Sequence, residues 1–324
     1  MKNKTVLVTG AAGFIGSHLS ERLVQLNYLV IGLDNFDEFY SPDIKWKNIK
    51  ALTKAENFQL IQGDIRDTDV LRDIFQKHDI DIVTHLAARA GVRPSIDKPL
   101  EYLDVNINGT LCLLEASRKY NIDRFLFASS SSVYGVQNKI PFREDSKICC
   151  PTSPYATSKA AAELYCRTYS HLYNMPVKVL RLFTVYGPRQ RPEMAIHQFV
   201  RKIDSGEEIA IFGDGTSKRD YTFVSDIING IINTMEYTDT QNFRIFNLGD
   251  SCPVTLEYLV DIIEKNMKKP VKRKIVPVQA GDVPITAADI SEARNHLGYN
   301  PQVPIEQGVP LFIEWYLKNK EAQA

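Results

Sequence analysis

Residues 5–16 read TVLVTGAAGFIG, a short apolar run followed at once by glycines at positions 10, 13 and 16. The apolar run predicts a buried strand, and residues 13–25 have the length and pattern of a helix. Gly10 and Gly13 permit a tight turn and close approach to a pyrophosphate, and Gly16 lets the helix pack on the strand with its N-terminus facing the phosphates. This stretch therefore predicts a dinucleotide-binding loop between a strand and a helix.

Short apolar runs alternate with helix-length segments over the first two hundred residues. Such alternation predicts an α/β fold, a doubly wound parallel sheet of the Rossmann type with helices on both faces. The expected strands are residues 5–9, 29–33, 58–62, 82–86, 125–128 and 177–183, and the expected helices include residues 13–25, 68–77, 100–120 and 158–173. Ligands dock at the carboxyl ends of the strands in such sheets.

The pattern changes after Gly187. The segment GPRQRPEMA is rich in proline and arginine, and helices expected at 225–236, 256–268 and 305–318 stand among isolated strands. We therefore expect a smaller α/β C-terminal lobe that holds the substrate. The expected dinucleotide-binding domain is residues 1–185 with a returning segment at about 222–250, and the expected substrate lobe is residues 186–221 and 251–324.

Composition excludes several classes of function. The 324 residues are 44% apolar and 24% charged, with 39 basic and 39 acidic side chains, and no block of like charge predicts a nucleic-acid partner. Nowhere do 18 consecutive apolar residues occur, so we expect no membrane association and a soluble cytoplasmic protein. Five cysteines without a C-x-x-C pair or a Cys/His cluster predict reduced thiols and no metal site, and they are Cys112, Cys149, Cys150, Cys166 and Cys252.

Acidic and small residues end the second, third and fourth expected strands. The Asp34 carboxylate can accept hydrogen bonds from the 2′-hydroxyl of an adenosine ribose and would repel a 2′-phosphate, which favours NAD over NADP. Asp64 and Ile65 are expected beside the adenine, and Ala87 and Ala88 leave room for the middle of the cofactor. The cofactor predicted from these residues is NAD.

The segment YATSK places a phenol, Tyr155, four residues before an ammonium, Lys159, and therefore on one face of a helix. A phenol titrates near pH 10 and is a poor base at neutral pH. A lysine at about 4 Å contributes about 4 kcal/mol at an effective dielectric constant of 20. With a cationic nicotinamide, that field is expected to bring the pKa of Tyr155 near 7. The serines at 129–132, at the end of an expected strand, supply hydroxyl donors beside this pair.

The motifs GAAGFIG, SSSSVYG and YATSK, together with Asp34, resemble the extended short-chain dehydrogenase/reductase family over nearly the whole chain. The resemblance implies that Tyr155 is the acid/base, that Lys159 lowers its pKa and holds the nicotinamide ribose, and that Ser130 bonds the reacting oxygen. Ser129 and Ser131 remain alternatives for the last role. The cofactor-binding residues that the resemblance implies are Gly10, Gly13, Phe14, Ile15, Gly16, Asp34, Asn35, Asp64, Ile65, Ala87, Ala88, Asn106, Tyr155 and Lys159.

Members of the family with such a lobe act on nucleotide sugars, and Arg219 in GDGTSKRDYTFV resembles the arginine that clamps the substrate diphosphate. Dehydratases and decarboxylases of the family carry acids just before VYG, where this chain has Ser131 and Ser132. Residues 90–93, 184–195 and 281–284 resemble epimerases of UDP-glucuronate. The implied reaction is NAD-dependent C4 epimerisation to UDP-galacturonate through a transient 4-keto sugar.

Arginines are the side chains best suited to bind the C6 carboxylate of a uronate. Arg191 is the first candidate, and Arg93 or Arg89 is the second. The full set of expected substrate-binding residues is Arg93, Ser130, Ser131, Thr184, Arg191, Arg219 and Asp282.

Two other functions remain open from the sequence. One is 4-epimerisation of a neutral UDP-hexose or a UDP-N-acetylhexosamine, and the other is nucleotide sensing without turnover. The resemblance also implies a homodimer, with the helices expected at 100–120 and 158–173 as its interface.

Overall fold

The computed structural model describes residues 4–137, 139–148, 150–278 and 281–320. Its centre is a seven-stranded sheet with the strand order β10-β6-β5-β4-β1-β2-β3, in which every neighbouring pair is parallel. The strands are β1 (Thr5–Thr9), β2 (Leu29–Asp34), β3 (Phe58–Gln62), β4 (Ile82–His85), β5 (Arg124–Ser130), β6 (Val177–Leu182) and β10 (Phe243–Leu248). The predicted doubly wound parallel sheet is confirmed.

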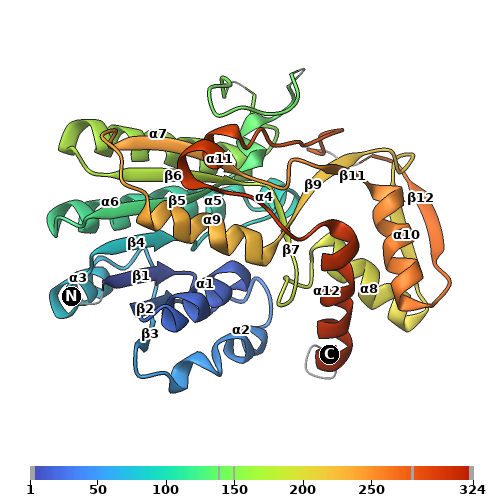
Figure 1. Cartoon of the computed structure of the whole chain (residues 1–324), viewed down its shortest axis with the longest axis horizontal. Helices are drawn as coiled ribbons and strands as arrows, with labels where there is room; N and C mark the ends of the chain where they lie inside the picture. The colour runs from blue at the N-terminus through green and yellow to red at the C-terminus, as the bar shows by residue number, and fades with distance from the viewer. Residues whose placement is uncertain (1–3, 138, 149, 279–280, 321–324) are drawn as a thin grey trace.

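Both faces of this sheet are buried, which explains why its strands are nearly continuous apolar runs. In β1, Val6 and Val8 join one hydrophobic core and Leu7 joins the other. The first core contains α1 (Phe14–Gln25) and α9 (Val224–Glu236), and the second contains α3 (Thr68–Lys77), α6 (Gly109–Lys119) and α7 (Pro154–Tyr173). Figure 1 shows these helices on the two sides of the sheet.

The strand order reverses between β1 and β4, because β2 and β3 continue from β1 in one direction while β5 and β6 continue from β4 in the other. Loops leaving the carboxyl ends of β1 and β4 therefore separate, and ligands bind in the crevice between them. The sheet order alone thus places a binding site beside the glycine loop.

A smaller lobe lies beside the large sheet (Figure 1). It contains a three-stranded sheet in the order β11-β9-β7 and a two-stranded sheet of β12 and β8. These strands are β7 (Thr184–Tyr186), β8 (Glu208–Phe212), β9 (Lys218–Phe223), β11 (Pro253–Thr255) and β12 (Lys272–Val276), and the helices are α8 (Ala195–Ser205), α10 (Leu256–Met267) and α12 (Ile305–Asn319). Helix α11 (Ser291–Leu297) instead packs against α9 and against β10 of the large sheet. The segment expected to return, 222–250, contains α9 and β10, and β10 pairs with β6 at the edge of the large sheet. The domain limits themselves stay a prediction.

Residues 100–120 do not form the single α-helix predicted for them. They form α5 (Pro99–Leu103), a π-helical turn at Asp104–Asn108 and then α6. A π-turn inserts an extra residue into a helix and is common at functional sites. Here it carries Asn106, whose buried side chain bonds the backbone N–H and carbonyl of Arg89 at 2.8 and 2.9 Å.

Two other boundaries differ from the prediction for identifiable reasons. Helix α7 begins at Pro154 rather than at 158, because Ser153 caps it by accepting a hydrogen bond from the Ala156 N–H at 3.1 Å. The run expected as one strand at 177–183 ends at Leu182, and Thr184 starts β7 in the other sheet. The chain therefore passes from the large sheet to the lobe within one residue.

The remaining short elements are α2 (Pro42–Ile49), α4 (Val92–Asp97) and the 3₁₀ turns Leu52–Lys54 and Ser131–Tyr134. No helix in the described part of the chain is long and apolar enough to cross a membrane. Among the same residues, no cluster of three or more His, Cys, Asp or Glu side chains is arranged to hold a metal ion. Four cysteines in this part of the chain form no disulfide, namely Cys112, Cys150, Cys166 and Cys252, and Cys149 lies outside it.

Candidate active site

The glycine loop joins β1 to α1 with a geometry that side chains would prevent. Gly10 has a φ of +70°, and a Cβ at Gly16 would lie 2.0 Å from the Gly10 carbonyl oxygen. Helix α1 begins after Gly13 without a side-chain cap and without an acidic residue in its first turn. Its first N–H groups are therefore available to an anion, as the pyrophosphate of a dinucleotide requires.

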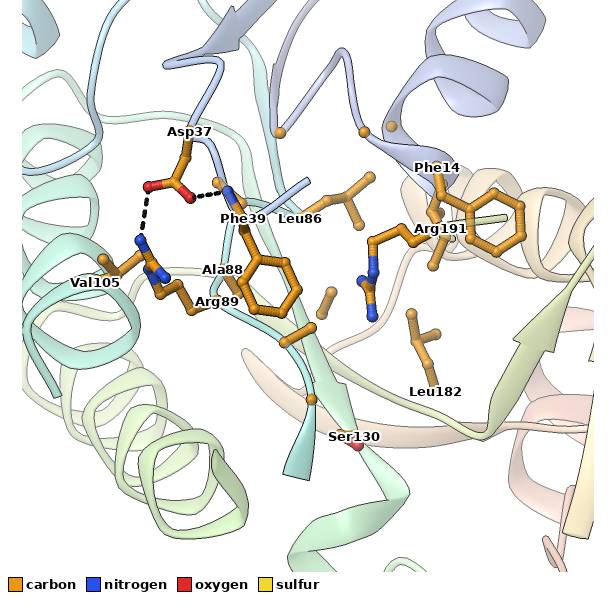
Figure 2. A pocket seen from close by; sticks show the side chains of 18 of the residues that line it. Phe14, Asp37, Phe39, Leu86, Ala88, Arg89, Val105, Ser130, Leu182 and Arg191 are labelled. Atoms are coloured by element: carbon orange, nitrogen blue, oxygen red, sulfur yellow. Dashed lines mark hydrogen bonds and ion pairs between the residues drawn. The ribbon is translucent and has the colours of Figure 1, made fainter. Parts of the chain in front are cut away.

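A cavity of about 360 Å³ opens from this loop across the carboxyl ends of the strands (Figure 2). It brings together most of the predicted residues, which are Gly10, Gly13, Phe14, Ile15, Gly16, Asp34, Asn35, Asp64, Ile65, Ala87, Ala88, Ser130, Ser131, Tyr155, Lys159, Thr184 and Arg191. The residues predicted for the site that do not line the cavity are Asn106, Arg93, Arg219 and Asp282. The loop and the cavity fit an extended dinucleotide with a second ligand beside it.

Asp34 holds the cofactor loop as well as facing the cavity. Its two oxygens accept hydrogen bonds from the N–H groups of Ala12 at 3.0 Å and Phe36 at 2.8 Å, and the Lys45 ammonium lies 3.7 Å away. A carboxylate oxygen has two lone pairs, so acceptor capacity remains for a ribose hydroxyl.

Asp64 stays ionised beside Asn35. The Arg66 guanidinium bonds it and lowers the pKa of the carboxyl to about 2. The Asn35 side-chain amide donates to Asp64 at 2.9 Å, which ties together the ends of β2 and β3. This pair gives the cavity a polar, negatively charged wall where the adenine end of the cofactor is expected.

Tyr155 lies in the first turn of α7 beside Ser130 at the end of β5. Burial raises the pKa of Tyr155, and it outweighs the nearby Ser130 hydroxyl and the Arg191 charge, which both act to lower it. Lys159 directs its ammonium to the Ala128 carbonyl oxygen at 2.7 Å, and burial lowers its pKa to about 8. Lys159 therefore does not lower the pKa of Tyr155 within the polypeptide alone, contrary to our expectation.

The structure distinguishes Ser130 from Ser129, one of its two alternatives. Ser129 donates its hydroxyl to the buried Glu163 carboxylate at 2.5 Å and is committed there. The Ser130 hydroxyl lies near the Tyr155 phenol, and it donates a hydrogen bond to the Ser132 hydroxyl at 3.1 Å. Of the alternatives, Ser130 is the hydroxyl placed with the phenol.

Arg191 and Arg89 lie on opposite sides of the cavity (Figure 2). Arg191 points into it, and its Nε donates to Glu193 at 2.5 Å, which leaves the terminal nitrogens of the guanidinium for a ligand. Arg89 is engaged by two carboxylates, Asp37 at 2.9 Å and Glu101 at 2.7 Å. Its charge is thus compensated within the protein, which makes it a poor candidate for the sugar carboxylate.

The other second-choice arginine lies in a different cluster. Arg93 and Arg219 approach the Asp282 carboxylate at 3.6 and 3.8 Å, and the Arg93 guanidinium stacks 4.8 Å over the ring of Phe212. Two guanidinium groups that share one carboxylate keep a net positive charge, which suits a diphosphate. The tertiary structure thus places Arg93 with Arg219 and not with Arg191.

Asn106 does not contact the cavity, contrary to the cofactor-binding role predicted for it. Besides its two bonds to the Arg89 backbone, it donates to the Ser158 hydroxyl at 2.9 Å, and Ser158 donates to the Tyr155 carbonyl oxygen at 2.8 Å. It braces the loop after β4 against the first turn of α7. The reason is the π-turn, which directs its side chain to the backbone.

The cavity lining also includes residues without a counterpart in the predicted site, among them Phe39, Tyr40, Lys45 and Met194. Three of them come from the loop after β2 and from α2, where the Lys45 ammonium lies 5.1 Å over the Tyr40 ring. No motif or spacing marks this segment, because its residues meet the cavity only through the fold. The cation–π contact shows how Lys45 is held beside Asp34.

The glycine loop and the Tyr155/Lys159 pair in one cavity define the class of protein. The sequence profile of the GDP-mannose 4,6 dehydratase family matches residues 7–311. The chain belongs to the NAD-dependent epimerase/dehydratase family of the extended short-chain dehydrogenases/reductases.

Individual relatives have more specific activities. The chain is 41% identical over 316 residues to a UDP-glucuronate 4-epimerase of Thermodesulfobacterium geofontis, covering 97% of both chains. It is similar to the crystal structure of UDP-glucuronic acid 4-epimerase from Bacillus cereus with UDP-glucuronic acid and NAD, with a TM-score of 0.92, 37% identity and coverage of 97% and 99%. It is also similar to UDP-glucose 4-epimerase from Thermotoga maritima with UDP-glucose, with a TM-score of 0.89, 33% identity and coverage of 98% and 99%.

Proposed function

We propose that the protein interconverts UDP-glucuronate and UDP-galacturonate by epimerisation at C4, with NAD held in the cavity. The observation that carries the proposal is the Arg191 guanidinium, which points into the cavity that Tyr155 and Ser130 also line (Figure 2). A cation at this place suits a sugar that bears a carboxylate at C6 while its C4 hydroxyl meets the phenol. The two UDP-glucuronate 4-epimerases described above support this choice of substrate.

Each residue has a defined task in this proposal. Tyr155 takes the proton of the C4 hydroxyl and later returns it, and Ser130 holds the same oxygen by a hydrogen bond. Lys159 keeps a positive charge beneath the phenol and is placed to bond the nicotinamide ribose. When bound, NAD supplies the acceptor and then the donor of the C4 hydride.

The cavity lacks the side chains expected for competing reactions of the family. Ser131 and Ser132 occupy the positions before VYG at which dehydratases and decarboxylases carry acids, and both line the cavity. Without a carboxyl group there, no acid is placed to move a proton at a neighbouring carbon. The reaction is therefore confined to C4.

A neutral sugar is the second candidate, and one observation favours it. Glu193 already pairs with Arg191 at 2.5 Å, so the guanidinium presents less uncompensated charge than an isolated arginine. A UDP-hexose with a C6 hydroxyl fits such a neutralised pair.

Proton NMR of the purified protein with UDP-glucuronate and, in parallel, with UDP-glucose decides between the two substrates. We expect the anomeric signal of UDP-galacturonate to grow without added NAD, and UDP-glucose to react at least about tenfold more slowly. Faster conversion of UDP-glucose would transfer the proposal to the neutral sugar. If neither compound is converted, both substrate proposals are refuted.

Asp34 is proposed to select NAD over NADP. Asp34→Asn keeps an acceptor oxygen for one of the two loop N–H groups and removes the charge that opposes a 2′-phosphate. In the unaltered protein the Lys45 ammonium lies 3.7 Å from Asp34. We expect the ratio of the Kd for NADP to that for NAD to fall by about tenfold or more, measured by calorimetry on cofactor-stripped protein. Asp43→Ala, an exposed carboxylate on α2, is the control and should leave the ratio unchanged. An unchanged ratio in Asp34→Asn would assign the selectivity elsewhere.

We further propose a homodimer that acts in the cytoplasm. Large apolar side chains stand exposed on α5 and α7, with Leu100 77%, Leu164 67% and Leu172 60% accessible. These helices lie in the two segments predicted for the interface, and covering their leucines would remove apolar surface from water. The molar mass in solution from light scattering tests the dimer.

A further inference from the structure

Glu163 is a buried carboxylate that no step of the proposed reaction uses. Its side chain is 4% exposed, and it follows Lys159 by four residues, so the two lie on the same face of α7. One oxygen accepts hydrogen bonds from Ser129 Oγ at 2.5 Å and Arg181 Nε at 3.0 Å, and the other accepts one from Arg181 Nη2 at 2.8 Å. Both partners belong to the large sheet, Ser129 to β5 and Arg181 to β6.

Three successive residues at the end of β5 each face one residue of α7. Lys159 bonds the Ala128 carbonyl oxygen and Glu163 accepts from Ser129, while Tyr155 lies near the Ser130 hydroxyl. Because positions 155, 159 and 163 are spaced by four, they form one stripe along the helix. This stripe fixes the register of α7 on β5 at the point where the phenol and the serine hydroxyl meet.

We propose that Glu163 is a positioning residue, which sets α7 against β5 so that Tyr155 and Ser130 reach the same substrate oxygen, and whose charge keeps Lys159 protonated. The inference rests on the proposed function for the identity of that oxygen. The hydrogen bonds of Glu163 to Ser129 and Arg181 are present within the polypeptide and involve no atom of substrate or cofactor.

The surroundings of Lys159 explain why one carboxylate matters. Burial lowers the pKa of Lys159 to about 8, and Cys166 and Glu163 act against this decrease. Of the other titratable groups that face it, burial raises the pKa of the Cys166 thiol and lowers that of His85 on β4 to about 3, so both are neutral at pH 7. The phenol beside it is neutral too, and the cation of β6, Arg181, is paired with Glu163. Among these groups Glu163 is the anion.

Ser129→Ala tests the positioning role, because it removes the bond from Glu163 to β5 and leaves the ion pair intact. We expect kcat for UDP-glucuronate to fall about tenfold or more, with the KM and the NAD content unchanged. Ser117→Ala is the matched control, a buried serine of α6 whose hydroxyl has no hydrogen-bond partner within the described residues, and its kcat should stay at the wild-type value. A wild-type kcat in Ser129→Ala, or a loss confined to KM, would overturn the role.

The charge of Glu163 is tested in Glu163→Gln, which keeps the size of the side chain and the positive charge of Arg181. In holoenzyme labelled with ¹³C at lysine Cε, a lysine that loses a neighbouring anion releases its proton at lower pH. The Lys159 signal, assigned with Lys159→Arg, should therefore titrate about one pH unit below the wild type. The alkaline limb of the kcat profile should move in the same direction.

An unchanged Lys159 midpoint in folded Glu163→Gln would refute the electrostatic role. If that variant loses its NAD and unfolds, Ser129→Ala still decides the positioning role by its kcat. The NMR titration needs no turnover, so it distinguishes a failure of this inference from a failure of the proposed function. A wild-type protein inactive on UDP-glucuronate would refute the latter alone.

Discussion

Replacing Tyr155 by phenylalanine is expected to abolish epimerisation while the protein keeps its NAD. The change removes the ionisable oxygen and leaves the ring, which packs edge-to-face on Tyr102 with a centroid distance of 6.2 Å. Positioned acid/base catalysis contributes at least about 100-fold, so kcat should fall by that factor or more. The measurement is the rate of UDP-galacturonate formation, together with the NAD released from denatured protein.

Tyr165→Phe is the control for this change. It lies on the same helix, is 40% exposed and is not part of the cavity lining, so its rate should equal that of the wild type. Activity in Tyr155→Phe within a few fold of the wild type would assign the proton transfer to another group. A loss of NAD from the variant would instead give the tyrosine a binding role.

Arg191→Ala is expected to impair the uronate far more than a neutral sugar. A hydrogen bond to a charged partner contributes about 1.5–3 kcal/mol, so kcat/KM for UDP-glucuronate should fall by about 10- to 200-fold. Any activity on UDP-glucose should change much less, since that substrate has no carboxylate to lose its partner. Arg201→Ala, an exposed arginine of α8, controls for the loss of a positive charge. Equal losses on both substrates would make Arg191 a diphosphate-binding or structural residue.

The same variant tests how the intermediate is protected. Oxidation at C4 creates a ketone beta to the C6 carboxylate, and such an acid readily loses carbon dioxide. Arg191 opposes this loss, because departing carbon dioxide would give up the charge-assisted hydrogen bonds of the carboxylate. With substrate labelled at C6 with ¹³C, we expect labelled UDP-galacturonate from the wild type and labelled bicarbonate from Arg191→Ala. Bicarbonate as the main wild-type product would refute the epimerase proposal.

Most of the large sheet was predictable because its information is local. Six of its seven strands were predicted as apolar runs bounded by turns, and their predicted limits differ from the observed ones by a few residues at most. The seventh strand, β10, was expected only as part of the returning segment 222–250. The exceptions arise where a distant group intervenes. The expected helix at 100–120 contains a π-turn at Asp104–Asn108, and there Asn106 bonds the backbone of Arg89. Nothing in the spacing of apolar residues records that contact.

For the candidate site, local and distant information divide differently. The glycine loop, Asp34 and the Tyr155/Lys159 pair were recognisable from spacing within one strand or helix, and all of them line the cavity. The arginines were not distinguishable in this way. Arg89 and Arg191 share a cavity, but only the packing of the loop after β2 and of α5 supplies the carboxylates that compensate Arg89.

The sequence by itself determined the order of strands and helices, the glycine turn and the stripe of polar residues on α7, since each depends on the conformation of neighbouring residues. The tertiary structure decided which of four adjacent serines stands on Tyr155 and which arginine faces the cavity. It also decided that Glu163 ties the helix to the strand. Those choices depend on side chains from segments far apart in the chain, and their contacts exist only after both faces of the sheet are covered and the loops are packed.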